Sequence, residues 1–274
     1  MDGASGEQTS RFPDRTVSTA ASSAPLADLP AGGLQTVVCI KWGNQYGPEY
    51  VNRLYSMIAR QARRPFRLVC LTDDASGLWS QIERHSIPAI PVPPGPERGW
   101  RKLAMFAPQM AEVLGDQALY LDLDVVLVDG IDAFFDQPGT FLIIRDWYYP
   151  LFPIGNSSVY RFRPPLSSGV YEDFCRNSQQ IAKRFRNEQE YLSAFMRSSG
   201  VLQFWPRDWC CSFKRHCIPW WPLNRWRSPS VPEGSRIVVF HGYPKPPDAI
   251  VGGPARSRAR AHLPAPWVAD HWRA

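Results

Sequence analysis

The chain has 274 residues, of which 44% are hydrophobic and 20% charged, a composition typical of a globular protein rather than a disordered or fibrous one. The 31 Lys and Arg residues outnumber the 25 Asp and Glu residues, for a formal charge of +6. That excess suits an anionic ligand but is too small to indicate nucleic-acid binding. The 27 prolines exclude a helical bundle or coiled coil, because internal proline breaks a helix.

The apolar runs are too short for a membrane span, which needs about 18 consecutive apolar residues. The first 35 residues also contain no apolar run of the kind that a signal peptide carries. The six cysteines fit reduced thiols better than a disulfide framework. We therefore expect a cytoplasmic protein.

Composition divides the chain into three parts. Residues 1–34 are rich in Ser, Ala, Gly, Thr and Pro, and we expect a mobile tail there. Residues 252–262 are basic and rich in Gly and Pro, so residues 252–274 are expected to form a basic C-terminal tail. The remaining span, 35–251, is predicted to be one folded domain.

Apolar runs alternate with amphipathic ones through this span. The pattern predicts strands over 36–40, 67–72, 118–122 and 141–144, helices over 49–60 and 102–114, and a late strand over 237–240. This alternation is typical of an α/β domain with a mainly parallel central sheet. In such sheets, ligands bind at the carboxyl ends of the strands.

Two carboxylates, Asp122 and Asp124, lie where the predicted strand over 118–122 ends. In the sequence Leu119-Tyr120-Leu121-Asp122-Leu123-Asp124, strand alternation places both aspartates on the same side of the sheet. Two like charges so close repel each other unless a cation lies between them. A hard divalent ion such as Mg²⁺ or Mn²⁺, shared with diphosphate oxygens, would satisfy both. The plain alternative is a pair of solvated loop acids.

An acidic pair in this place resembles the DxD motif of nucleotide-sugar glycosyltransferases with the GT-A fold, a Rossmann-like single α/β domain. More narrowly, the chain is similar to glycosyltransferase family 8, the glycogenin and bacterial galactosyltransferase group. Its landmarks follow in the family's order: Trp100-Arg101-Lys102-Leu103, Asn156-Ser157-Ser158-Val159, Glu188-Gln189 and His241-Gly242-Tyr243-Pro244-Lys245-Pro246. The chain departs from the pattern at Ser158, where glycine is usual, at Glu188, where aspartate is usual, and at Pro247, where tryptophan is usual.

The resemblance implies a role for each matched position. It implies Mn²⁺ or Mg²⁺ held by Asp122, Asp124 and His241, and a nucleotide-sugar donor, with UDP-sugar favoured. It implies that Glu188 and Gln189 lie near the transferred sugar, as candidate catalytic residues. The implied donor-binding residues are Lys102, Asn156, Lys245, Arg101 as a second cation for the diphosphate, and Asn44 and Tyr46 in the loop expected to stack on the base.

Each of these residues also has a plain interpretation when it is taken alone. His241 could be a packed histidine at a strand end, Lys102 a solvated helix lysine, and Glu188 an acid that stabilises a helix start. A rival enzyme class is a phosphatase of the haloacid-dehalogenase type, whose nucleophile motif is met by residues 122–127. A non-catalytic nucleotide-sugar-binding module is the alternative from another class.

Five of the 11 tryptophans lie in residues 204–226, together with three cysteines and His216. The spacing of Cys210, Cys211, His216 and Cys217 differs from that of zinc fingers and ribbons. The stretch could instead be an interfacial membrane patch, an acceptor-binding wall or a proline-broken part of the core. We expect some tryptophans in the core and some near the acceptor, whose identity stays open, with an anionic or lipid-linked molecule among the options.

Overall fold

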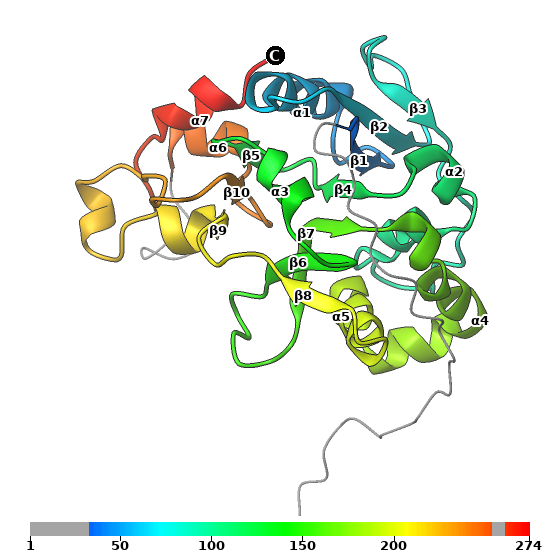
Figure 1. Cartoon of the computed structure of the whole chain (residues 1–274). Helices are drawn as coiled ribbons and strands as arrows, with labels where there is room; N and C mark the ends of the chain where they lie inside the picture. Colours follow the sequence, from blue (N-terminus) through cyan, green and yellow to red (C-terminus); the bar gives the residue numbers. More distant parts are fainter. Residues whose placement is uncertain (1–32, 254–260) are drawn as a thin grey trace, which may run out of the picture. The chain divides into compact units, whose positions relative to one another are not determined.

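The computed structural model describes residues 33–253 and 261–274 (Figure 1). The mobile tail predicted over 1–34 lies outside the described residues except for its last two positions. Most of the low-complexity segment at 252–262 lies outside them as well.

A seven-stranded sheet forms the centre, in the order β3-β2-β1-β4-β7-β6-β8. Its strands are β1 (Gln35–Lys41), β2 (Phe66–Thr72), β3 (Glu83–His85), β4 (Ala118–Leu121), β6 (Phe141–Arg145), β7 (Gly155–Phe162) and β8 (Leu202–Phe204). Strands β3, β2, β1 and β4 run parallel, β6 is parallel to β8, and β7 is antiparallel to both β4 and β6. The predicted α/β class with a mainly parallel sheet is confirmed.

Alternation along the strands gives the sheet two apolar faces. Val37 and Cys39 of β1 pack in one cluster with α1 (Pro48–Gln61), whereas Val38 and Ile40 pack in the other cluster. The second cluster includes residues of η1 (Trp100–Phe106), α2 (Met110–Leu114), α4 (Gly169–Arg184) and α5 (Glu188–Ser198). Both faces of the sheet are therefore covered, as its continuous apolar strands require.

The helix predicted over 102–114 is divided into two pieces. The first, η1, is a 3-10 helix, and the second, α2, is a single short α-helix. Pro108 lies between them and has no backbone N–H to donate to a continuous helix. The break leaves Lys102 on the short η1 segment beside the end of β4.

A second, three-stranded sheet has β10 (Ile237–Val239) between β5 (Val125–Leu127) and β9 (Cys210–Ser212). Because β10 pairs with β5, the segment after β10 lies beside the acidic pair, and Phe240 N donates to Asp124 O at 2.9 Å. The remaining elements are α3 (Asp132–Asp136), η2 (Pro164–Leu166), η3 (Phe213–Cys217), η4 (Leu223–Arg225), α6 (Pro246–Val251) and α7 (Pro266–His271).

The C-terminal segment packs against the domain instead of leaving it. Ala265 and Val268 are fully buried, and Trp272 is nearly so. The compact unit accordingly extends to Ala274, beyond the boundary at 251 that composition predicts. Composition alone misses this, because a few apolar anchors in a basic, proline-rich segment carry the packing.

None of the helices in the described ranges has both the length and the hydropathy that crossing a bilayer requires. All six cysteines are free thiols.

Candidate functional site

A cavity of about 270 Å³ opens at the carboxyl ends of β1 and β4. These strands are neighbours in space, and the chain order reverses between them, which is where open α/β sheets bind ligands. The cavity is lined by Ile40, Trp42, Gln45, Tyr46, Glu97, Arg98, Gly99, Lys102, Asp122, Leu123 and Asp124. Both aspartates of the acidic pair therefore face one space.

Each aspartate of the pair already has an ammonium partner. Lys102 Nζ lies 2.7 Å from Asp122 Oδ1, and the Tyr120 hydroxyl donates to the same oxygen at 2.6 Å. Lys245 Nζ lies 2.6 Å from Asp124 Oδ2, which also accepts from the Tyr46 hydroxyl at 2.9 Å. The repulsion expected within the acidic pair is thus relieved by two lysines.

The electrostatics of this cluster follow from burial. Burial and the nearby Asp122 charge raise the pKa of Asp124, although Lys245 and Tyr46 oppose the rise. Burial alone would lower the pKa of Lys102, but the charges of Asp122 and Glu188 outweigh it and raise that pKa. Lys102 is therefore a firmly held cation at neutral pH.

Glu188 lies on the other side of Lys102, with 3.9 Å between Lys102 Nζ and Glu188 Oε1. It is the first residue of α5, whose N-cap Asn187 accepts from the backbone N–H of Glu190. Its carboxylate accepts a short hydrogen bond from the Ser157 hydroxyl. Burial raises the pKa of Glu188, while Lys102 and Ser157 oppose the rise.

Gln189 connects this cluster to a residue that the sequence analysis did not single out. Its Oε1 accepts from Ser157 N at 3.4 Å, and its Nε2 donates to Asp146 Oδ2 at 3.2 Å. Asp146 is buried, and its other oxygen accepts the backbone N–H groups of Tyr148 and Tyr149. Asp146 directly follows the apolar strand β6, the same signal that drew attention to Asp122 after β4.

Several predicted site residues have their partners outside the cluster around Asp122 and Asp124. His241 Nε2 lies 2.7 Å from Ser212 Oγ, and its ring stacks on Trp147 at 5.6 Å between centroids. Arg101 pairs with Glu97 at 3.3 Å. The remaining two are Asn156, whose Oδ1 accepts from Ser158 N of its own strand, and Asn44, which is exposed in the loop where Gln45 and Tyr46 line the cavity.

Tyr46, predicted to stack on a nucleotide base, contacts other protein residues in this structure. Its hydroxyl is held by Asp124 and Lys245, its ring packs edge-on against Tyr50, and Lys245 Nζ lies 5.0 Å from the ring centroid. In this structure the Tyr46 hydroxyl donates a hydrogen bond to Asp124 of the acidic pair.

Oxygen donors suited to a divalent ion are present, but the predicted third ligand is not with them. No group of three or more His, Cys, Asp and Glu side chains in the described residues is placed to hold a metal. Two carboxylates suffice for Mg²⁺ or Mn²⁺ when phosphate oxygens complete the shell. The residues therefore fit a cation that arrives with a diphosphate ligand, held by Asp122 and Asp124.

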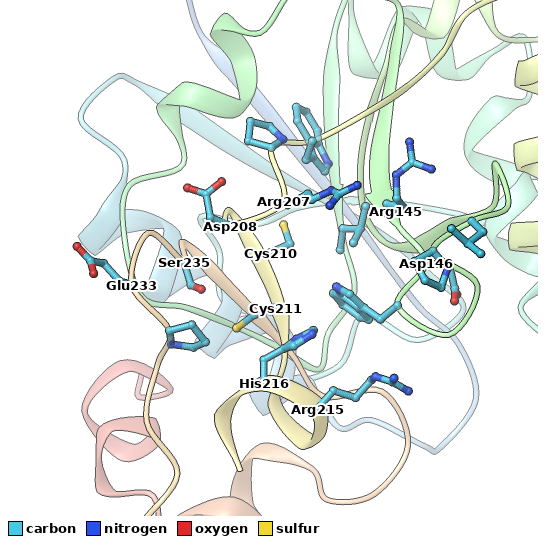
Figure 2. Close-up of a pocket in the computed structure, with 17 residues that line it drawn as sticks. Arg145, Asp146, Arg207, Asp208, Cys210, Cys211, Arg215, His216, Glu233 and Ser235 are labelled. Carbon is cyan, nitrogen blue, oxygen red and sulfur yellow. The ribbon is translucent and has the colours of Figure 1, made fainter. Parts of the chain in front are cut away.

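A second and larger cavity, of about 670 Å³, lies beyond Asp146 and Trp147 (Figure 2). Its walls come from the end of β6, from residues 205–216 and from the turn over 232–235. It shares no lining residue with the first cavity. Asp146 lines the second cavity and accepts a hydrogen bond from Gln189.

The tryptophan-rich stretch divides between core and surface, which agrees with the prediction that some of its tryptophans lie in the core. Trp205 is buried and lines the second cavity, whereas Trp220, Trp221 and Trp226 are exposed. Cys211 Sγ and Cys217 Sγ lie 3.9 Å apart without forming a metal-binding group with other described residues.

Solved structures of glycosyltransferases share this fold. Galactosyltransferase LgtC, solved with donor and acceptor sugar analogues, matches with a TM-score of 0.53 and 13% identity over 77% of this chain and 89% of its own. The bifunctional glycosyltransferase WbbM matches with a TM-score of 0.53 and 12% identity over 80% of this chain and 48% of its own. Glycosyltransferase GlyE of Streptococcus pneumoniae TIGR4 matches with a TM-score of 0.53 and 11% identity over 77% of this chain and 56% of its own.

The chain thus spans most of LgtC and about half of WbbM and GlyE. No protein-family model and no curated protein matches it. At these identities, the likeness establishes the fold, which is the GT-A fold that the sequence motifs predict.

Proposed function

We propose that this protein is a glycosyltransferase that moves a sugar from a nucleoside-diphosphate sugar, with UDP-sugar favoured, to an acceptor. The observation that carries the proposal is the placement of two carboxylates and two lysines, Asp122, Asp124, Lys102 and Lys245, at the strand-order switch point of a GT-A fold. Carboxylates that share a cation with a diphosphate, beside fixed ammonium groups, match the charge of such a donor.

The two lysines have different parts in this proposal. Lys102 is held between Asp122 and Glu188 and provides a fixed positive charge beside the departing diphosphate. The Lys245 side chain is partly exposed, and in this proposal it exchanges Asp124 for a phosphate oxygen of the donor. That exchange frees the Asp124 carboxylate when a donor enters.

Asp122 and Asp124 would hold the divalent ion, Mn²⁺ or Mg²⁺. When it is bound, the ion supplies positive charge that neutralises the diphosphate as a Lewis acid. His241 bonds to Ser212 and stacks on Trp147, so in this structure its ring is held apart from Asp122 and Asp124.

The sugar-binding side is formed by Glu188, Gln189 and Asp146. Glu188 is buried beside Lys102, so its charge is felt strongly by a transferred sugar in the cavity. Gln189 is oriented from both ends, by Ser157 N and by Asp146, and can direct its amide at sugar hydroxyls. Asn156, fixed on its strand by Ser158, would line this side.

A panel of nucleotide-sugars tests the proposal. Purified protein is incubated with each donor in Mn²⁺ or in EDTA, and the release of free nucleoside diphosphate is measured. We expect slow hydrolysis of at least one donor in Mn²⁺ and loss of that activity in EDTA. Asp124→Asn should abolish it, whereas Asp116→Asn, which changes an exposed aspartate outside the cavity, should not.

Each alternative function gives its own outcome. Release of phosphate from monoesters, without cleavage of any donor, would identify a phosphatase that uses Asp122. Saturable donor binding without turnover in any metal would identify a binding module. Neither result is compatible with the proposed transferase.

A further inference from the structure

The second cavity borders the proposed reaction site. Asp146 lies in its wall and bonds to Gln189, Gln189 accepts from Ser157 N, and the Ser157 hydroxyl bonds to Glu188. Lys102 Nζ lies 3.5 Å from Ser157 Oγ, which brings the chain of contacts to the donor cavity. These contacts link the wall of the second cavity to Lys102 in the donor cavity.

The cavity presents flat apolar surfaces of the kind that bind sugar rings. Trp147 and Trp205 line it, with Trp147 held by stacking on His241 and Trp205 held by donation from its Nε1 to Val159 O at 3.2 Å. Aromatic side chains fixed in this way offer contact area at little conformational cost. A volume of about 670 Å³ falls within the usual range of ligand pockets, about 300–1,000 Å³.

Three arginines give the cavity a cationic side. Arg145, Arg207 and Arg215 line it, and Figure 2 shows all three toward the side that holds Asp146. Arg145 lies over the ring of Phe204 at 3.9 Å, and Arg215 lies over Tyr148 at 4.4 Å. These stacking contacts orient two of the guanidinium groups without neutralising them.

The cavity also has three carboxylates, Asp146, Asp208 and Glu233, and within the described part of the chain none of them forms an ion pair with a cavity arginine. Among the described residues, the ion pairs of arginine involve other positions, and none of the three cavity arginines has one. Asp146 is committed to Gln189 and to two backbone N–H groups. Asp208 and Glu233 lie on the far side in Figure 2, where Asp208 approaches the turn at Gly234.

We propose that the second cavity is the acceptor site and that it selects a saccharide bearing a carboxylate or phosphate group. The arginines bind the anionic group, the two tryptophans contact a sugar ring, and Asp208 and Glu233 accept from hydroxyls at the far end. Guanidinium groups suit this task because they bind carboxylate and phosphate through paired N–H donors. That the bound saccharide is an acceptor rests on the proposed transferase function, whereas the anion-binding site itself does not.

Two matched pairs of probes test the site in the full-length protein. Cellobiouronic acid and cellobiose differ in one carboxylate, and glucose 6-phosphate and glucose differ in one phosphate. Binding is measured by titration calorimetry with and without the donor found in the panel. We expect at least one charged probe to bind about 10-fold tighter than its neutral partner, because hydrogen bonds to an ionised group are stronger than those to a neutral group.

Variants then locate the binding. The double variant Arg207→Gln with Arg215→Gln should bring the charged-to-neutral ratio close to 1, whereas Arg197→Gln, at an exposed position in the last turn of α5, should leave it unchanged. A second measurement needs no variant: raising the salt from about 0.1 M to about 1 M should weaken only the charged probe.

The outcomes separate the two proposals. Donor hydrolysis combined with equal binding of charged and neutral probes, or with binding of neither, overturns the anionic acceptor site and leaves the transferase standing. Selective anion binding in a protein that cleaves no donor keeps the site and overturns the transferase. Selective binding that survives in the double variant places the anion elsewhere and overturns the site.

Discussion

Lys245 Nζ lies 2.6 Å from Asp124 Oδ2, although 121 residues separate the two in sequence. Lys245 is the N-cap residue of α6, and Asp124 lies between β4 and β5, so this ion pair joins the C-terminal part of the domain to the acidic pair. The Tyr46 hydroxyl contacts both partners, at 2.9 Å from the carboxylate and 2.5 Å from the ammonium. Three segments therefore close around one carboxylate oxygen.

Replacing Lys245 with methionine should destabilise the fold and weaken donor binding. Asp124 is only 7% exposed and would keep Tyr46 but lose its cation. Because Lys245 is partly exposed, we expect a loss of about 1–3 kcal/mol in the free energy of unfolding at neutral pH. Urea titration measures it, with the exposed Lys183→Met as control. Equal midpoints for K245M and the unmodified protein would show that the ion pair is energetically silent.

The second prediction concerns how the free energy of unfolding depends on pH, and it follows from the raised pKa of Asp124. The folded state holds the Asp124 proton to higher pH than the unfolded state, so it binds more protons above the ordinary pKa of 3.8. This contribution lowers the free energy of unfolding as pH rises through the interval between the two pKa values. In Asp124→Asn that contribution is gone, and the variant should gain stability relative to the unmodified protein as pH rises from about 4 to about 7.

Urea unfolding at a series of pH values tests the sign. Glu188, whose pKa burial also raises, gives a contribution of the same sign in both proteins and cancels in the comparison. Asp116→Asn, at an exposed position, should follow the unmodified protein. A stability difference between D124N and the unmodified protein that stays constant, or that shrinks as pH rises, contradicts the raised pKa.

The sequence predicts the sheet and the acidic pair because both depend on local patterns. Apolar runs of four to eight residues mark β1, β2, β4 and β6, and an acid after such a run lies at the sheet edge where ligands bind. Lys102 and Lys245 lie beside the acidic pair, as their order along the chain suggests.

Side-chain partners chosen by distant segments could not be predicted in this way. His241 ends a strand as a metal ligand would, but Ser212 and Trp147, from β9 and the segment after β6, hold its ring. Asp146 carried the same local signal as Asp122, and only the position of Gln189 on α5 distinguishes it from a solvated acid. The C-terminal boundary failed for a similar reason, since Val268 and Trp272 are buried by residues far away in sequence.

Gly99 provides a test of the Glu188 position. Its φ of +81° lies in the left-handed region, and a Cβ added there would come within 2.6 Å of Glu188 Oε2. Gly99→Ala should cost about 1–2 kcal/mol in backbone strain and, in addition, push Glu188 away from Lys102. We therefore expect reduced stability together with reduced donor cleavage.

The matched control for this change is Gly200→Ala. Gly200 has a φ of +72°, but a Cβ there meets no atom within 4 Å. This variant should show a similar loss of stability in urea titration and retain its donor cleavage. If both variants lose activity equally, the effect of Gly99→Ala is general destabilisation, and the assigned position of Glu188 gains no support.

Of the substitutions outside the cavities, replacement of Arg161 is expected to cause the largest loss in the free energy of unfolding. Its side chain is fully buried in β7, where Nη1 donates to Phe134 O at 2.9 Å and Gln137 O at 2.6 Å, and Nη2 donates to Gly139 O at 2.6 Å. Burial lowers the pKa of Arg161 to about 10, which still leaves it charged at neutral pH. One guanidinium thus satisfies the carbonyl groups that lead from α3 into β6.

Arg161→Met would leave these buried carbonyl oxygens without donors, at about 1–3 kcal/mol for each unsatisfied group. We expect a loss of several kcal/mol, or no folded protein, and only partial recovery in Arg161→Lys, because an ammonium lacks the planar fork that reaches both ends of the segment. Arg176→Met, at an exposed position on α4, should be neutral. Thermal and urea unfolding measure the series, and full stability of R161K would contradict the role assigned to the fork.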